Sequence, residues 1–149
     1  MNHQAIYALL AAVAGAFIAL QATANGKFRS NLGDPWYPAF FSICGTILTA
    51  CVLMLIFRPP APSMAAIQST PWWNWIGGPL GAMIVLAGAA LTPHLGAATF
   101  VAFVVGGQLI CSVFLDHFAL MGLPERSITF GRIIGVFLVI AGVACIKYF

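Results

Sequence analysis

The chain has 149 residues, of which 62% are hydrophobic and only 6% are charged. Soluble domains use about one quarter charged residues, so a chain of this composition cannot cover its surface with polar groups and needs lipid as its solvent. The formal net charge of +3 comes from six Lys and Arg residues spread through loops and ends, which is no basic footprint for nucleic acid.

Five apolar windows have the length of a membrane-spanning helix, which needs about 20 residues to cross about 30 Å of hydrocarbon. They lie at 4–24, 38–57, 72–91, 95–115 and 128–146. Their apolar runs are continuous, whereas barrel strands alternate between a lipid face and a polar lumen face. The sequence therefore predicts an all-α integral membrane protein, with one five-helix domain over residues 1–149.

Turn-forming residues separate the windows. The predicted breaks are Asn25-Gly26 and Asp34-Pro35 after the first window, Pro59, Pro60 and Pro62 after the second, Pro93 in a very tight third turn and Pro124 in the fourth. A cleaved signal peptide is an alternative for the first window, because Ala22-Thr23-Ala24 resembles a cleavage site. The stretch before the apolar run lacks Lys and Arg, however, and the run is long, which favours a retained helix.

The first helix carries few polar groups. Tyr7, Ala14, Gln21 and Asn25 share one face at spacings of seven, seven and four residues. Tyr7, Gln21 and Asn25 are candidates for lining a substrate path. Because Gln21 and Asn25 lie near the predicted helix end, and Asn25 precedes a glycine, capping and turn roles are the alternative for these two.

The third and fifth helices contain glycine pairs at a spacing of four residues, which lets helix backbones approach closely. These pairs are Gly77 with Gly81 and Gly131 with Gly135. We expect them to serve helix packing.

The fourth helix ends in a polar stripe, since Gln108, Ser112 and Asp116 are four residues apart and stack on one face. Such a stripe should face the bundle interior or a wet cavity, because lipid exposure is costly. It either lines the substrate path or holds helices together. Asp116 has a candidate partner in Arg132, and this ion pair either takes part in coupling or only fixes the hairpin of the last two helices.

Lys and Arg are evenly divided between the two ends of a five-helix bundle. Arg58, Arg126 and Arg132 share the N-terminal face, and Lys27, Arg29 and Lys147 share the other. Since the cytoplasmic side collects these residues, an even count favours neither orientation. Copies inserted in both directions could pair into an antiparallel ten-helix dimer, with a substrate site between the inverted halves.

Reactive residues do not form a catalytic pattern. The four cysteines, Cys44, Cys51, Cys111 and Cys145, all fall inside apolar windows without a metal-binding spacing. The sequence shows no nucleophile with a base, no phosphate loop and no metal cluster. We therefore expect no enzyme activity, no metal and no cofactor.

Four stretches resemble the YdcZ-type family of inner-membrane exporters, which belongs to the drug/metabolite transporter superfamily. They are "IALQATANGKFRSNLG", "GGPLGAMIV", "GGQLICSVFLDHFALMGLP" and "RIIGVFLVIAGV". The resemblance implies a multi-pass protein of the bacterial inner membrane that works as an antiparallel dimer, of identical chains or with an opposite-topology homologue. It also implies kinship with the small multidrug exporters. Their membrane-embedded first-helix glutamate is absent here, so their coupling chemistry does not carry over.

The expected function is secondary-active export of small metabolites or drug-like molecules by alternating access. The partners would be a second, inverted copy, lipid and a small-molecule substrate, without nucleic acid. The alternative is a non-transporting integral subunit that braces a larger membrane complex. Substrate, direction and coupling ion do not follow from the sequence.

Overall fold

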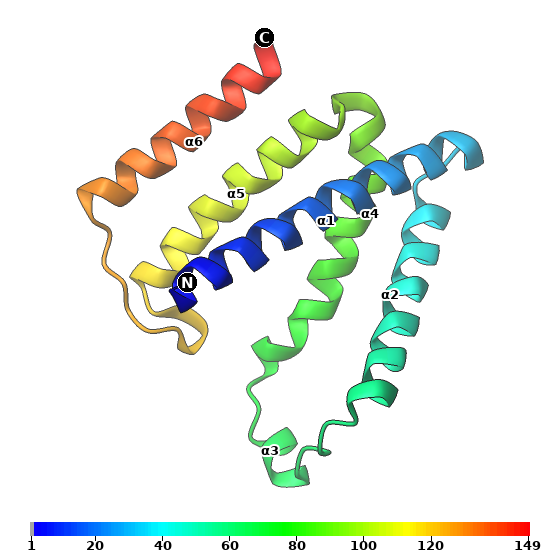
Figure 1. The fold of residues 1–149 in the computed structure, drawn as a ribbon, viewed down its shortest axis with the longest axis vertical. Helices are drawn as coiled ribbons and strands as arrows, with labels where there is room; N and C mark the ends of the chain where they lie inside the picture. Colours follow the sequence, from blue (N-terminus) through cyan, green and yellow to red (C-terminus); the bar gives the residue numbers. More distant parts are fainter. Residues whose placement is uncertain (1) are drawn as a thin grey trace. The chain divides into compact units, whose positions relative to one another are not determined.

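The computed structural model describes residues 2–149, and these residues form helices joined by turns, without a strand among them (Figure 1). Five helical segments are long and apolar enough to cross a membrane. In chain order the elements are α1 His3–Leu32, α2 Trp36–Phe57, α3 Met64–Gln68, the 3-10 helix η1 Trp72–Ile76, α4 Gly77–Leu95, α5 Ala97–His117, η2 Leu120–Gly122 and α6 Phe130–Tyr148. The predicted all-helical fold with five spanning helices is confirmed. The antiparallel dimer stays a prediction.

The chain divides into two compact units. One unit contains residues 2–20 and 94–149, which supply the first part of α1 together with α5 and α6. The other unit contains residues 21–93, which supply the rest of α1, α2, α3 and nearly all of α4. Each unit has its own packing.

Helix α1 is longer than its sequence pattern predicts. It continues through Asn25 and Gly26 to Leu32, so the predicted break at Asn25-Gly26 is wrong. Both residues are buried, and helix packing outweighs the weak helix propensity of Asn and Gly. The chain turns instead at Gly33, whose φ of +86° is a conformation that glycine adopts readily.

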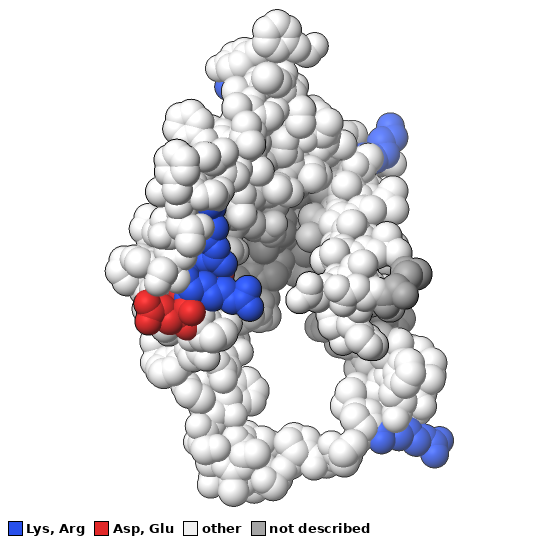
Figure 2. All heavy atoms as spheres, turned by 60° about the vertical axis from the view of Figure 1, so that its left-hand side comes forward, with Lys and Arg blue, Asp and Glu red and all other residues white. Residues whose placement is uncertain are grey.

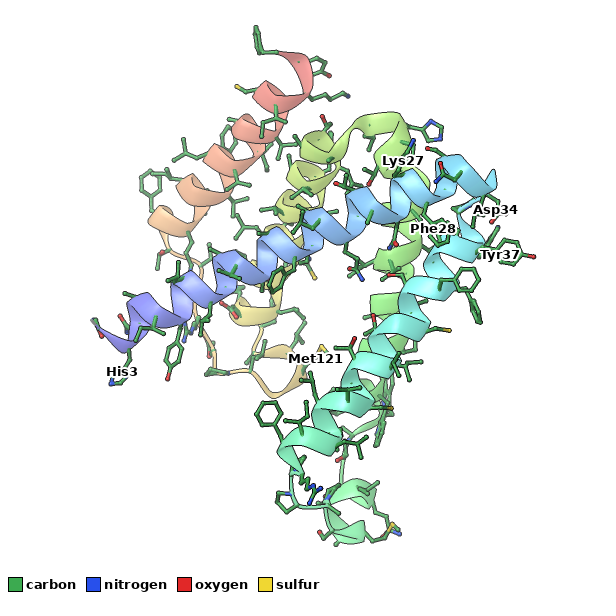
Figure 3. The ribbon with its side chains drawn as sticks, turned by 45° about the vertical axis from the view of Figure 1, so that its right-hand side comes forward. His3, Lys27, Phe28, Asp34, Tyr37 and Met121 are labelled. Atoms are coloured by element: carbon green, nitrogen blue, oxygen red, sulfur yellow. The ribbon has the colours of Figure 1, made fainter. Side chains whose placement is uncertain are left out.

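The Asp34 side chain starts α2. Its Oδ1 atom accepts the backbone N–H of Trp36 at 2.8 Å and that of Tyr37 at 3.3 Å. These bonds satisfy N–H groups that have no partner within the first turn of a helix. Figure 3 shows Asp34 in the connection between the two helices, with Tyr37 at the beginning of α2. This carboxylate therefore has a structural role at the helix start.

Helix α4 contains the proline that was predicted to form a turn. Pro93 lies inside the helix, which ends at Leu95, so its predicted place in the third turn is wrong. A proline this close to a helix end breaks few hydrogen bonds. Gly96, with φ of +80°, makes the connection to α5 alone.

In the unit of residues 21–93, α1 packs against α4 through small residues. A Cβ atom added to Gly26 would lie 3.1 Å from Thr92 Cβ and 3.2 Å from Pro93 Cδ, so the two helices touch directly. On the α2 side, the Phe28 ring stacks against Phe41 with 6.0 Å between centroids. The buried residues of α1 and α4 are Ala22, Asn25, Gly26, Gly88, Ala89 and Thr92.

In the other unit, α5 and α6 lie side by side (Figure 1). A Cβ atom on Gly106 would lie 3.5 Å from Val143 Cγ2, an ordinary contact distance. Near the end of α6, Lys147 Nζ lies 5.8 Å from the centre of the Phe103 ring on α5, within the range of a cation–π interaction.

Candidate functional site

Helix α5 places its three predicted polar residues on one side. Gln108, Ser112 and Asp116 follow one another at four-residue spacing within an unbroken helix. Ser112 Oγ donates a hydrogen bond to the Gln108 carbonyl oxygen at 2.8 Å, which satisfies the hydroxyl within its own helix. The Gln108 side chain is exposed. The Gln108 side-chain amide is therefore accessible to a solute or a second chain.

Asp116 and Arg132 form an ion pair, with 3.2 Å between Asp116 Oδ2 and Arg132 Nη2 and side-chain exposures of 31% and 30%. Arg132 Nη1 also donates to the Arg126 carbonyl oxygen at 2.9 Å, and the Arg126 backbone N–H donates to the Asp116 carbonyl oxygen at 2.8 Å. We call Asp116, Arg126 and Arg132 the loop clasp. It closes the base of the connection between α5 and α6, and Figure 2 shows acidic side chains gathered against basic ones.

His117 contributes a further contact to this connection. Its Nδ1 atom accepts the backbone N–H of Ile128 at 3.4 Å. The long distance indicates a weak bond. A structural role of Asp116 is thus visible, and its role in coupling stays a prediction.

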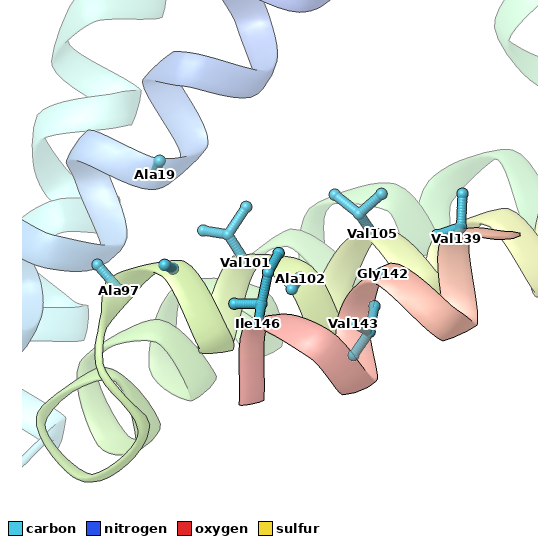
Figure 4. Close-up of a pocket in the computed structure, with 10 residues that line it drawn as sticks. Ala19, Ala97, Val101, Ala102, Val105, Val139, Gly142, Val143 and Ile146 are labelled. Carbon is cyan, nitrogen blue, oxygen red and sulfur yellow. The ribbon is translucent and has the colours of Figure 1, made fainter. Parts of the chain in front are cut away.

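An apolar groove lies along α5 and α6 (Figure 4). Its volume is about 390 Å³, and α1 contributes Ala19 at one end. The lining consists of alanine, valine, isoleucine and glycine: Ala19, Ala97, Ala98, Val101, Ala102, Val105, Val139, Gly142, Val143 and Ile146. No residue of the α5 polar stripe is among them. An apolar chain fits such a lining, and a polar solute does not.

The polar residues of α1 have different surroundings. Tyr7 is exposed, at 67%. Gln21 is also exposed, and its Nε2 atom donates to Ser42 Oγ on α2 at 3.3 Å. Asn25, one turn further on, is buried at 7% exposure. A turn or capping role for Gln21 and Asn25 does not apply, because both lie inside α1.

Asn25 lies where α1 and α4 cross. Its Nδ2 atom is buried without a hydrogen-bond partner among the residues that the structure describes, and the same holds for Thr92 Oγ1 on α4. Thr92 is also only 7% exposed. On the next turn of α1, Arg29 Nη1 donates a hydrogen bond to the Ala90 carbonyl oxygen.

The four glycines predicted to pack helices have no close neighbour within residues 2–149. A Cβ atom added to Gly77, Gly81, Gly131 or Gly135 would meet nothing within 4 Å. Gly26 of α1 makes a tight approach instead, against Thr92 and Pro93. The four glycines remain available to another chain, and their packing role stays a prediction.

The structure brings together some of the candidate residues and not others. Asp116 meets Arg132, and the three polar residues of α5 share one helix side, whereas Gln21 and Asn25 belong to the other compact unit. Sequence reasoning missed Thr92, because a single threonine in an apolar helix is unremarkable. Its only signal was the proline that follows it.

Metal ligands do not gather within the described part of the chain. Among residues 2–149, no group of three or more His, Cys, Asp and Glu side chains is close enough to hold an ion. All four cysteines are free thiols on exposed helix faces.

Comparison with known proteins identifies relatives in the inner membrane. Residues 6–145 match the model of the family described as "Putative inner membrane exporter, YdcZ". The Inner membrane protein YdcZ of Escherichia coli K12 is 40% identical over 76 residues, which cover 51% of this chain and 50% of that protein. The chain thus aligns with about half the length of this curated relative. No solved structure matches. The predicted location, a multi-pass protein of the inner membrane, is confirmed.

Proposed function

Because the chain belongs to the YdcZ family of inner-membrane exporters, we propose that it is a secondary carrier built from two inverted copies of itself. Each copy supplies five helices, and the solute passes between the halves by alternating access. The cargo is a small, partly apolar metabolite or drug-like molecule. The role is transport and not catalysis, because the sequence offers no nucleophile with a base and no phosphate-binding loop.

The observation that carries this proposal is the even distribution of Lys and Arg between the two ends of the helices. Arg58 caps α2, Arg126 lies in the α5–α6 connection and Arg132 lies in the first turn of α6. Three other cations lie at opposite helix ends: Lys27 and Arg29 in α1 and Lys147 in the last turn of α6. With three cations at each end, the positive-inside rule gives no preference for one orientation.

The length of α1 supports this assignment of charges. Its 30 residues rise about 45 Å at about 1.5 Å per residue, which exceeds the hydrocarbon thickness of about 30 Å. The end of α1 therefore extends to the membrane surface. Lys27 and Arg29 can count as interfacial charges although they are part of a helix.

Unused packing surface also supports a second copy. Within the most apolar window of α2 no residue is buried, and in α6 only 6% of the window is buried. A Cβ atom on Gly77 or Gly81 of α4, or on Gly131 or Gly135 of α6, would meet nothing within 4 Å among residues 2–149. Lipid or an inverted partner can cover these faces, and close approach through glycine favours a helix as the occupant.

Gln21, Gln108 and Ser112 are the proposed path residues, with Tyr7 and Asn25 as further candidates. Asp116 lies on the same side of α5 as Gln108 and Ser112, and it is already paired with Arg132. A proton-coupled step at Asp116 would have to break the loop clasp. Coupling through another group, or transport down a simple gradient, leaves the clasp intact.

Reporter fusions to the C-terminus test the orientation. We expect reporters that are active on either side of the membrane to score on both sides for the unmodified chain. Adding two lysines after Phe149 should drive the population to one orientation. A reporter found on one side only in the unmodified chain contradicts the inverted homodimer and points to a separate opposite-facing partner.

Reconstitution tests transport. Purified protein in liposomes should move a solute from a panel of small amphiphiles, and a Gln108→Ala variant should slow it. Cys111→Ala, on the same helix, is the matched control. If the protein moves no solute under any proton gradient and is isolated only with a larger partner, the carrier is refuted. The result then supports the alternative, a non-transporting subunit that braces a larger complex.

A further inference from the structure

The crossing of α1 and α4 buries two polar groups that make no hydrogen bond with residues 2–149. They are the Nδ2 atom of Asn25 and the Oγ1 atom of Thr92, each on a residue that is only 7% exposed. The two helices touch at this level, since Gly26 meets Thr92 and Pro93 directly. A face of α1 with Asn25 and Gly26 thus lies against a face of α4 with Thr92.

Orphaned groups of this kind are rare in folded proteins, because a buried donor without an acceptor loses its hydration without compensation. Both atoms are shielded in this conformation, so water does not reach them directly. Val and Leu have similar side-chain sizes and would fill these two positions without an unsatisfied polar group. Two buried polar groups in an otherwise apolar crossing therefore indicate a ligand that binds reversibly.

The chemistry around the two atoms selects the kind of partner. Asn25 Nδ2 is a donor only, and the Thr92 hydroxyl can donate as well. Arg29 lies one turn beyond Asn25 on the same side of α1 and reaches α4, where it donates to the Ala90 carbonyl oxygen. Donors and a positive charge converge here, which suits an acceptor of negative charge.

Carboxylates are nearly absent from this part of the chain. Between residues 21 and 93 the sequence contains three cations, Lys27, Arg29 and Arg58, and a single acid, Asp34. Asp34 Oδ1 is used to cap α2. An organic cation would find no counter-charge at the crossing, whereas an organic anion would find both charge and donors.

Building on the proposed carrier function, we propose that Asn25 and Thr92 are the solute-binding pair, and that the solute class is small amphiphilic carboxylates. The carboxylate accepts hydrogen bonds from Asn25 Nδ2 and the Thr92 hydroxyl, and the Arg29 guanidinium contributes attraction. The apolar body of the solute lies among the alanines and glycines of the two helices.

Solute entry requires α1 and α4 to separate, because both atoms are shielded in this conformation. The helices are suited to this movement. Their contact at Gly26 consists of carbon atoms of Thr92 and Pro93, so the hydrogen bond that opening has to break is the one from Arg29 to the Ala90 carbonyl oxygen. Pro93 has no N–H to offer the Ala89 carbonyl oxygen, which leaves α4 less tightly bonded at this point.

Two substitutions separate binding from packing. Thr92→Val and Asn25→Leu keep the side-chain size and remove the orphaned groups. If Asn25 Nδ2 and the Thr92 hydroxyl bind a solute, both substitutions stabilise the solute-free protein. The Tm of each variant in detergent is then a few degrees above that of the wild-type protein. Transport of radiolabelled benzoate into liposomes weakens at the same time, with KM raised about tenfold or more for the loss of a hydrogen bond to a charged group. Thr92→Ser keeps the hydroxyl and should retain the wild-type KM.

Thr49→Val is the matched control. Thr49 lies in the same unit, on α2, and its hydroxyl donates to the Gly45 carbonyl oxygen at 2.9 Å. We expect neither its KM nor its response to benzoate to change. Tetraphenylphosphonium serves as a cationic probe, and it should neither be transported nor inhibit benzoate uptake.

The outcomes distinguish this proposal from the carrier function. If wild-type protein transports benzoate and the KM of both variants is unchanged, or if tetraphenylphosphonium is the better substrate, the carboxylate site is refuted and the carrier stands. If wild-type protein transports no solute, thermal shift decides: a rise in Tm with benzoate that both variants lose supports the site, and no rise in wild-type protein refutes it. A lower Tm for both variants also refutes it, because the groups then serve packing.

Discussion

Replacing Gly26 by alanine tests the contact on which the α1–α4 crossing depends. The added methyl carbon would lie 3.1 Å from Thr92 Cβ and 3.2 and 3.4 Å from two ring carbons of Pro93. Favourable carbon contacts are about 3.5–4.0 Å, so the helices must move apart by about half an ångström. Overpacking of this kind costs about 1–3 kcal/mol, and the helix propensity of alanine returns about 1 kcal/mol. The expected net loss in the free energy of unfolding is about 1 kcal/mol.

Gly15→Ala is the control for helix propensity, because it lies in the same helix and its added methyl group meets nothing within 4 Å. This variant should be stabilised by up to about 1 kcal/mol. The difference between the two alanine variants then isolates the overpacking cost, about 1–3 kcal/mol. Unfolding by SDS titration in mixed micelles, followed by circular dichroism, measures it. Equal stability of the two variants would show that α1 and α4 do not touch at Gly26.

Substitutions at four further positions test contacts outside the crossing. Asp116→Asn and Arg132→Gln should each destabilise the fold, and the double variant should reveal a coupling free energy of about 1 kcal/mol; additive effects would exclude the loop clasp. Asp34→Ala should cost about 1 kcal/mol through loss of the α2 cap, whereas Asp34→Asn should be nearly neutral; equal losses would contradict the capping role. Gly135→Leu should lower the dimer fraction seen by cross-linking in membranes while the helix content of the chain stays unchanged, and an unaltered dimer fraction would remove this glycine from the interface.

The spanning helices could be predicted because lipid imposes a simple length requirement on apolar segments. The ends of the helices were harder. Asn25-Gly26 has the composition of a turn, yet α1 continues through both residues, with Gly26 packed tightly against Thr92. Pro93 likewise belongs to α4, because a proline near a helix end disrupts little. Local composition identifies residues that tend to end a helix, but tertiary contacts decide whether the helix ends there.

The candidate site was predictable where residues are close in sequence. Asp116 and Arg132 flank one connection, so their pairing follows from two adjacent helices. The pairing of α1 with α4 joins segments more than sixty residues apart, and no periodicity in the sequence announces it. Thr92 is a candidate because its hydroxyl is buried without a hydrogen-bond partner among residues 2–149. Burial is a property of the fold, and residue type alone does not reveal it.

The single-residue connection at Gly96 has a consequence for biogenesis. With so little chain between α4 and α5, we expect the two helices to enter the membrane together as a hairpin. The tip of this hairpin carries no Lys or Arg, so no anchor holds it on the side where synthesis occurs. The orientations of the two helices are then linked. Small changes elsewhere in the chain can therefore decide the orientation of the whole protein in the membrane.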